Sequence, residues 1–249
     1  MKRALLLFPL VILLLAFTSC TRSKPYQRPI DKKNITTTRP YVAPQDVAVV
    51  TPAPTPKPID RSLLIVIDPG HGGKDFGCES FLKPKALEKQ MALHTSILVS
   101  KYLKKIGYKT VLTRKDDIFI PLKTRAEFAN LHQSTLFVSV HYNSAQSRDA
   151  QGVEVFYYKS DDLPKRSASS KQLAGNVLDS IIKSTQAKSR GVKHGNFAVI
   201  RETKMPAILI EAGFLTNDEE ATRLGDPGYQ KRLSYAIAQG IHRHLSQEG

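Results

Sequence analysis

Three apolar runs constrain the fold of this chain most, because a titratable side chain follows each of them directly or within a few residues. The runs cover 63–67, 136–140 and 208–210, and the side chains that follow them include His71, His141 and Glu211. An unbroken apolar run of this length is typical of a strand covered on both faces, as in a parallel sheet. Because ligands collect at the carboxyl ends of strands in open α/β sheets, we expect these side chains to meet in one crevice.

The segments between these runs alternate between strand-like and helix-like patterns, which predicts an α/β fold. Apolar residues recur at helical spacing over 87–106, and Gly107 then supplies a stop signal. A second amphipathic segment, 229–245, closes the chain as a predicted helix. Shorter helices are expected at 121–131 and 171–185, and further strands at 108–113, 153–158, 197–200 and 207–210.

Composition limits the number of domains and the class of partner. The 249 residues, 41% of them hydrophobic, suffice for one domain with a real core plus some non-globular chain. The formal net charge of +15 favours anionic partners. However, the sequence has no clustered basic helix, no zinc-finger spacing and no aromatic RNA-binding strand, so nucleic acid is not expected as a partner. Nothing in the sequence indicates an oligomeric state.

The amino terminus has the three regions of an export signal over residues 1–20. Charged residues 2–3 precede the apolar stretch 4–17, and two small residues then stand before Cys20. A membrane-spanning helix needs about 20 apolar residues, so a retained anchor is the less favoured reading. Cys20 resembles the lipidated cysteine of a bacterial lipoprotein signal, although Phe17 stands where that motif commonly has leucine. We therefore expect an exported, periplasmic protein that Cys20 anchors to a membrane, with no disulfide between Cys20 and Cys78.

Residues 21–61 are rich in proline, threonine and basic residues. Proline favours the extended polyproline II conformation, and the segment has too few large apolar residues to offset chain entropy. The sequence therefore predicts a tether over 21–61 and a catalytic domain over 62–249.

Glycines surround His71 at positions 70, 72 and 73. Such a loop can cradle a phosphate, but Lys74 is followed by Asp75 rather than by serine or threonine. The same glycines allow His71 to turn its ring into a crevice and bind a metal ion, which is the reading we favour. His141 follows a predicted buried strand directly and precedes a polar loop, so it is the second candidate ligand. Two histidines with carboxylates nearby suggest zinc.

Several carboxylates are candidates for a third ligand. Glu88 lies in the first turn of a predicted helix, where simple stabilisation by the helix dipole is the alternative explanation. His194 is kept as a reserve ligand, and Cys78 is expected to be a small buried residue rather than a ligand. The other carboxylate candidates are Asp68, Asp75, Glu79 and Glu211.

Four segments, in this order along the chain, resemble the zinc-dependent N-acetylmuramoyl-L-alanine amidases of bacterial cell walls. They are 67–73, 87–89, 139–143 and 210–217. The resemblance implies a single three-layer α/β domain with a largely parallel six-stranded sheet flanked by helices. It also implies that His71, Glu88 and His141 bind Zn²⁺ and that Glu211 is the catalytic carboxylate. A further matching segment contains Arg125 and Asn130, which are expected to orient the substrate peptide or to support the site.

The activity implied by this resemblance is hydrolysis of the amide between N-acetylmuramic acid and L-alanine in the peptidoglycan stem peptide. Intact wall, precursors or recycled fragments remain open as substrates, and the expected role is cell-wall remodelling or daughter-cell separation. Three protein ligands leave one metal position for water, and Glu211 is expected to take the water's proton and return it to the departing amine.

Two other functions are weighed against the amidase. Ser-x-x-Lys spacing at Ser80/Lys83 and Ser180/Lys183 matches serine acyl-transferases that react with penicillin, but no Lys-Thr-Gly partner is present. A wall-binding module that uses its basic charge to hold an anionic glycan is the non-enzyme alternative. The presence of candidates for all three ligands and for the catalytic carboxylate disfavours that module.

Overall fold

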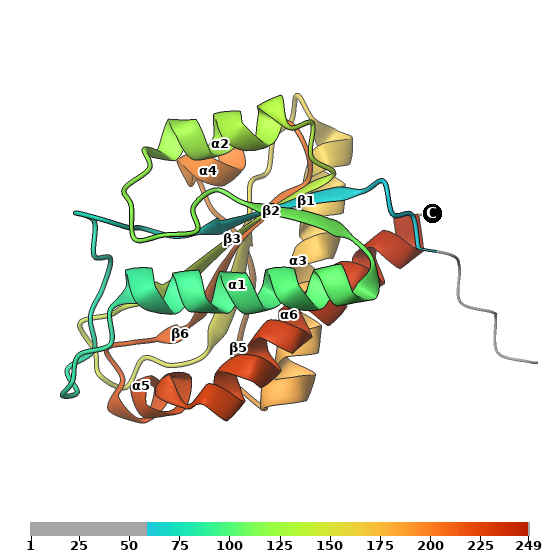
Figure 1. The fold of residues 1–249 in the computed structure, drawn as a ribbon. Helices are drawn as coiled ribbons and strands as arrows, with labels where there is room; N and C mark the ends of the chain where they lie inside the picture. Colours follow the sequence, from blue (N-terminus) through green and yellow to red (C-terminus); the bar gives the residue numbers. More distant parts are fainter. Residues whose placement is uncertain (1–58, 249) are drawn as a thin grey trace, which may run out of the picture. The chain divides into compact units, whose positions relative to one another are not determined.

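A six-stranded sheet in the order β2-β1-β3-β6-β4-β5 lies at the centre of the protein in a computed structural model that describes residues 59–248 (Figure 1). Strands β1, β2, β3 and β6 run parallel to one another, whereas β4 pairs antiparallel with β6 and parallel with β5. The sheet is therefore largely parallel, as the family resemblance implies. The strands are β1 Leu64–Pro69, β2 Lys109–Leu112, β3 Leu136–Asn143, β4 Val153–Tyr157, β5 Ser189–His194 and β6 Ala207–Phe214.

Helices cover both faces of this sheet and form the two outer layers of a single three-layer α/β domain (Figure 1). On one face, α1 (Glu88–Ile106) and α3 (Pro164–Thr185) both pack against α6 (Pro227–Glu248). On the other face, α2 (Leu122–Leu131) packs against α4 (Ala198–Arg201). Helix α5 (Asp218–Gly225) follows β6 and contacts α6.

Alternate residues of the strands belong to two separate hydrophobic clusters, one on each face of the sheet. Ile65 and Ile67 of β1 pack in the cluster that includes α1, α3 and α6. Val66, between them, packs in the cluster that includes α2 and α4. All three side chains are fully buried, and each contributes about 1.5–3 kcal/mol by leaving water. The unbroken apolar run in the sequence thus reflects burial on both faces.

Parallel pairing aligns the carboxyl ends of the central strands. Pro69 of β1 lies opposite Val140 of β3, and His141 lies opposite Glu211 of β6. Residues more than 60 positions apart in the sequence therefore meet at one edge of the sheet, as the apolar runs predict.

The predicted strand at 197–200 is wrong. These residues form the short helix α4, which packs its apolar side chains Val199 and Ile200 under the sheet. The sixth strand is instead β5, an edge strand whose residues are mostly polar and partly exposed, so the sequence lacks the apolar signal of a strand. Helix α3 also begins at Pro164, earlier than the predicted 171, and the short helix α5 was not predicted.

The predicted export signal, Cys20 and the tether up to residue 58 lie outside the described residues. Ile59, which falls in the predicted tether, packs against the larger hydrophobic cluster. Within 59–248, every helix is too short or too polar to serve as a membrane span.

Candidate metal centre

Glu88 is the first residue of α1, and the loop after β1 holds it in place. Leu87, at the helix N-cap, makes no side-chain capping bond. Instead, the Glu88 amide donates to the carbonyl of Cys78 at 2.9 Å. The Glu88 carboxylate accepts from the amide of Cys78 at 2.8 Å through Oε2 and from the amide of Tyr142 at 3.1 Å through Oε1. The side chain is 4% exposed, so these bonds offset the loss of hydration of a buried charge.

His71 lies in the glycine-rich loop after β1 and has a backbone φ of 57°. A non-glycine residue in this left-handed region carries strain of about 1–2 kcal/mol. The conformation directs the imidazole at Glu88, with 2.9 Å between His71 Nε2 and Glu88 Oε1. The other ring nitrogen, Nδ1, lies 2.9 Å from Asp75 Oδ1, which orients the ring from its opposite side.

His141 projects from β3 onto the same carboxylate oxygen. Its Nδ1 lies 2.9 Å from Glu88 Oε1. The ring packs directly over Gly70, because a Cβ placed on Gly70 would lie 2.3–2.6 Å from three atoms of the imidazole. Gly70 is therefore required by close approach of the ligand ring and not by a left-handed backbone.

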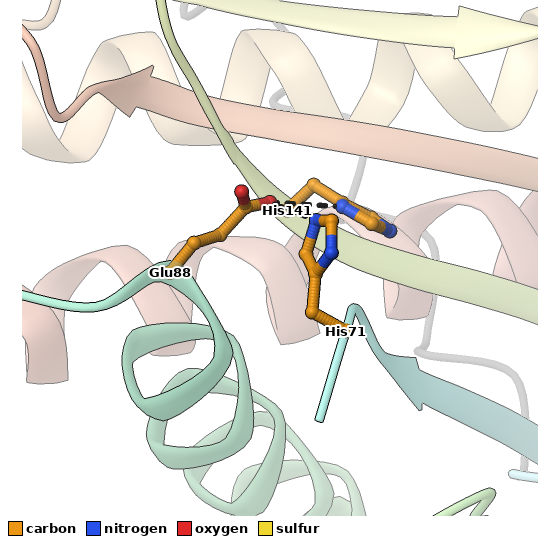
Figure 2. Close-up of side chains that lie close together, drawn as sticks. All are labelled: His71, Glu88 and His141. Carbon is orange, nitrogen blue, oxygen red and sulfur yellow. Dashed lines mark hydrogen bonds and ion pairs between the residues drawn. The ribbon is translucent and has the colours of Figure 1, made fainter. Parts of the chain in front are cut away.

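The three side chains converge from β3, from the loop after β1 and from the start of α1 (Figure 2). One ligand atom from each of His71, Glu88 and His141 lies within 4.8 Å of the others, and these form the metal-capable group found among residues 59–248. Two imidazoles and one carboxylate are the protein ligand set of catalytic zinc sites that keep one position open. The ligand types, their convergence and the orienting contact from Asp75 therefore fit a zinc ion.

The electrostatics of the cluster favour binding of a cation. Burial raises the pKa of Glu88, but hydrogen bonds from His141 and His71 lower it by more, so its pKa lies well below its usual range. Burial lowers the pKa of His71, but contacts with Glu88 and Asp75 raise it by more. The Glu88 carboxylate is therefore negatively charged and lies against two imidazoles. A cation bound here would lie between this carboxylate and both imidazoles.

Glu211 lies beside this cluster on β6. Its Cα is in register with His141 of β3 on one side and with Glu154 of β4 on the other. Burial, together with the charges of Glu88 and Glu154, raises the pKa of Glu211 well above its usual range. Its Oε2 is buried and has no hydrogen-bond partner among the described residues. A carboxyl group whose pKa is raised in this way binds a proton more readily than an ordinary glutamate, which suits it to proton transfer.

A crevice of about 560 Å³ is lined by Glu211 together with His71, Glu88 and His141. Its other walls include Cys78, Asn143 and Phe197, which the sequence does not identify as lining a site. The thiol of Cys78 donates to the carbonyl of Tyr142 at 3.2 Å, and burial raises its pKa well above the usual value. Cys78 is therefore a neutral, partly buried residue in the wall of the crevice.

Arg125 and Asn130 lie outside this crevice. Arg125 is 2% exposed and lies beneath the His71 loop, where it donates to the carbonyl of His71 at 2.7 Å. Asn130 connects α2 to the segment before β6 by donating to Glu202 O at 2.9 Å and accepting from Lys204 N at 2.8 Å. The contacts of Arg125 are those of a residue that supports the site, and a role of either side chain in orienting the substrate stays a prediction.

The remaining candidate ligands also lie apart from the cluster. Asp68 is fully buried and accepts from Arg125, Thr113 and Ser139. Glu79 is paired with Lys85, and His194 accepts from the amide of Lys159 at 3.1 Å.

Neither Ser-x-x-Lys pair lines the crevice. Ser80 is 1% exposed, and its hydroxyl accepts from the amide of Ala86 at 2.8 Å. Ser180 and Lys183 lie on α3, which packs against α6.

Sequence comparison relates the domain to one family. The family sequence model described as Amidase_3, N-acetylmuramoyl-L-alanine amidase, matches residues 65–243. The chain is 37% identical over 183 residues to the uncharacterized protein YqiI of Bacillus subtilis (strain 168), which covers 74% of this chain and 85% of YqiI. It is 32% identical over 182 residues to the probable cell wall amidase LytH of Staphylococcus aureus, which covers 73% of this chain and 58% of LytH.

Solved structures show the same similarity in three dimensions. The N-acetylmuramoyl-L-alanine amidase from Clostridium difficile 630 superposes with a TM-score of 0.71 at 36% identity, covering 76% of this chain and all of that one (100%). The catalytic domain of the amidase CwlV from Bacillus (Paenibacillus) polymyxa var. colistinus superposes with a TM-score of 0.68 at 38% identity, covering 74% and 98% of the two chains. At these identities the similarity covers the sequence as well as the fold.

Proposed function

Since this chain belongs to the N-acetylmuramoyl-L-alanine amidase family, we propose that it is a zinc-dependent hydrolase of the bacterial cell wall. The scissile bond is the amide that joins N-acetylmuramic acid to L-alanine of the peptidoglycan stem peptide. The observation that carries the proposal is the convergence of His71, Glu88 and His141 beside Glu211 in one crevice.

His71, Glu88 and His141 would hold the zinc ion, which supplies Lewis acidity to a carbonyl oxygen and lowers the pKa of water. Glu88 presents an ionised carboxylate, and its hydrogen bonds to the amides of Cys78 and Tyr142 keep that carboxylate in place. Asp75 holds the ring of His71 from the side away from the cluster. The ligand geometry is thus determined by partners outside the three ligands, as is typical of metal centres.

Glu211 would act as the proton carrier. Its unpartnered Oε2 accepts the proton of the attacking water and then donates it to the amine that leaves with the stem peptide. The raised pKa makes Glu211 a stronger base toward the water's proton than a carboxylate of usual pKa, so that the accepted proton is held until the amine departs. Phe197 and Leu209 contribute apolar side chains to the lining of the crevice.

The cellular setting is part of the same proposal. Residues 1–20 would export the chain, and lipidation of Cys20 would anchor the domain to a membrane through the tether, within reach of periplasmic peptidoglycan. The polymer itself, its precursors or its fragments would be the substrate, in wall remodelling or daughter-cell separation. Incorporation of labelled palmitate that is lost in Cys20→Ser would support the anchor, and unlabelled wild-type protein would contradict it.

The deciding experiment incubates the full chain, purified in detergent, with peptidoglycan and identifies released fragments by mass. We expect free stem peptides beginning with L-alanine, their loss with a chelator, and their return with added Zn²⁺. Elemental analysis should find one zinc per chain in the wild type and none in His141→Ala. His94→Ala, which removes an exposed histidine of α1, is the matched control and should keep both zinc and activity.

Two outcomes would contradict the proposal. Release of stem peptides that persists in chelator, at full rate, would rule out zinc dependence. Binding to peptidoglycan without release of any fragment would favour the wall-binding module over the hydrolase.

A further inference from the structure

Two buried arginines lie beneath the loop that carries His71. Arg114 and Arg125 are both 2% exposed, and neither lines the crevice. Together they donate to the carbonyl oxygens of three consecutive residues, Pro69, Gly70 and His71. The three backbone carbonyls point toward the two guanidinium groups. The His71 ring lies on the opposite side of the loop, where it faces Glu88.

The contacts are short and shared between the two side chains. Pro69 O accepts from Arg114 Nε at 3.1 Å and from Arg125 Nη1 at 2.6 Å. Gly70 O accepts from Arg114 Nη2 at 2.6 Å, and His71 O accepts from Arg125 Nη2 at 2.7 Å. Hydrogen bonds from a charged donor are about twice as strong as neutral ones, so these four bonds hold the backbone firmly.

The contact with Arg125 falls on the residue whose backbone is strained. His71 has a φ of 57°, and strain of this kind persists only where the surrounding structure over-determines the conformation. Arg125 is itself fixed, because its Nη1 lies 2.9 Å from Oδ1 of the fully buried Asp68 and its Nε donates to Ile120 O at 2.9 Å. A fixed donor on His71 O therefore keeps that carbonyl, and with it the left-handed backbone, from turning.

Arg114 adds a link between two of the ligand-bearing segments. Its Nη2 donates to Gly70 O at 2.6 Å and to Lys89 O at 2.7 Å. Gly70 immediately precedes His71, and Lys89 immediately follows Glu88 on α1. One guanidinium nitrogen thus joins the backbones beside two ligands and determines their separation.

We propose that Arg114 and Arg125 are positioning residues that lock the left-handed backbone of His71 and its distance from Glu88, so that the metal centre is organised before an ion binds. The inference rests on the proposed metal-dependent function. It assigns the two arginines a role through His71 and Glu88 and not through substrate. Lysine at either position would keep the charge but lose the planar fork that reaches two acceptors at once.

The test compares Arg114→Lys and Arg125→Lys with a matched control, Arg166→Lys. Arg166 is 7% exposed and also donates to backbone carbonyls, those of Met205 at 3.0 Å and of Ile200, but it lies away from the crevice. All three variants are expected to lower thermal stability. Zinc affinity, measured by competition with a chromogenic chelator in the full chain, should fall about 10–100-fold in the first two and stay at the wild-type value in the control.

Chemical rescue separates a positioning role from general loss of packing. In Arg125→Ala, millimolar guanidinium chloride should restore zinc affinity at least in part, whereas the same concentration of sodium chloride should not. If Arg125→Ala does not fold, Arg125→Lys and Arg114→Lys carry the test.

A second measurement does not depend on metal. The amides of Gly72 and Asp75 donate to each other's carbonyls at 2.9 and 3.1 Å, so their hydrogen exchange reports the order of the loop. In the metal-free chain we expect exchange at both amides to be at least about tenfold faster in Arg125→Lys than in Arg166→Lys. Wild-type protein that binds no zinc would refute the proposed function and leave this comparison intact. Equal zinc affinities and equal exchange in all three lysine variants would overturn the positioning role.

Discussion

Replacing Gly70 by alanine tests whether the close approach of the His71 loop to His141 determines the metal centre. The added Cβ would lie 2.3 Å from Cε1, 2.5 Å from Nε2 and 2.6 Å from Nδ1 of His141. Ordinary contact begins at 3.4 Å, so the ring or the loop must move by about 1 Å. Gly70 does not have a left-handed φ, so alanine is compatible with its backbone and the clash is the main perturbation.

Neither side of this contact has room to give way. The amide of Gly70 donates to Val140 O at 3.0 Å, and its carbonyl accepts from Arg114 at 2.6 Å. His141 belongs to β3, which has a neighbouring strand on each side. Metal-ligand distances vary by only about 0.2 Å between good sites, so a displacement of about 1 Å removes His141 from productive coordination. We expect zinc affinity to fall by about 100-fold or more, and peptide release by about 100-fold even at saturating zinc.

The assay measures zinc affinity by chelator competition and stem-peptide release by mass, at a temperature well below the melting point of each variant. Gly175→Ala is the matched control, because Gly175 lies inside α3 and a Cβ there would meet nothing within 4 Å. That control should keep wild-type zinc affinity and gain about 0.5–1 kcal/mol of stability. A folded Gly70→Ala protein with wild-type zinc affinity and wild-type release would refute the reasoning.

Three further predictions concern stability and its pH dependence. Glu154 accepts from Asn143 at 2.7 Å, from Arg190 at 3.0 Å and from Lys193, and although burial raises its pKa, the bonds from Lys193 and Arg190 lower it below the usual 4.5. This stabilisation is present above pH 4.5 and is lost as the pH falls through the lower pKa that Glu154 has in the folded state. Glu154→Gln should therefore lower the free energy of unfolding in urea, and its difference from the wild type should shrink on acidification. A difference that stays constant from neutral to acidic pH would contradict this. Asn217→Ala removes the side-chain acceptor of the Glu220 amide at 2.9 Å, at the start of α5, and should lower the free energy of unfolding by about 1 kcal/mol in the same assay. Gly240→Ala would place a Cβ 2.5 Å from Val177 Cα where α6 crosses α3, and this overpacking should cost about 1–3 kcal/mol, so an unchanged melting temperature would show that the two helices can separate freely.

Much of the site follows from local sequence. The apolar runs that become β1, β3 and β6 are visible without a structure, because strands covered on both faces are apolar at most positions. His71, His141 and Glu211 are then placed at one edge by a general property of parallel sheets. Spacing alone left Glu88 as one of five carboxylate candidates, and the family resemblance singled it out. In the structure Glu88 is buried under two amide donors and two imidazoles, whereas Asp68 is enclosed by Arg125, Thr113 and Ser139.

Other features had no local signal. Strand β5 is polar and lies at the sheet edge. It forms by pairing with β4, and its own side chains lack the apolar pattern that would predict a strand. The apolar segment 197–200 reads as a strand but is a helix, since burial of Val199 and Ile200 requires apolar residues in either conformation. In an apolar run this short, the pattern indicates burial but does not distinguish a strand from a buried helical segment.

Sequence by itself therefore determined the α/β class, the strand ends that carry the site and the stop of α1 at Gly107, because each depends on burial or on backbone conformation over a few residues. The three-layer architecture was implied by the family resemblance. Tertiary structure alone decided that β4 runs against β6 and that Arg125 lies under the His71 loop instead of in the crevice. The physical reason is that a guanidinium finds its acceptors among carbonyls more than 50 positions away, and only the folded chain brings these together.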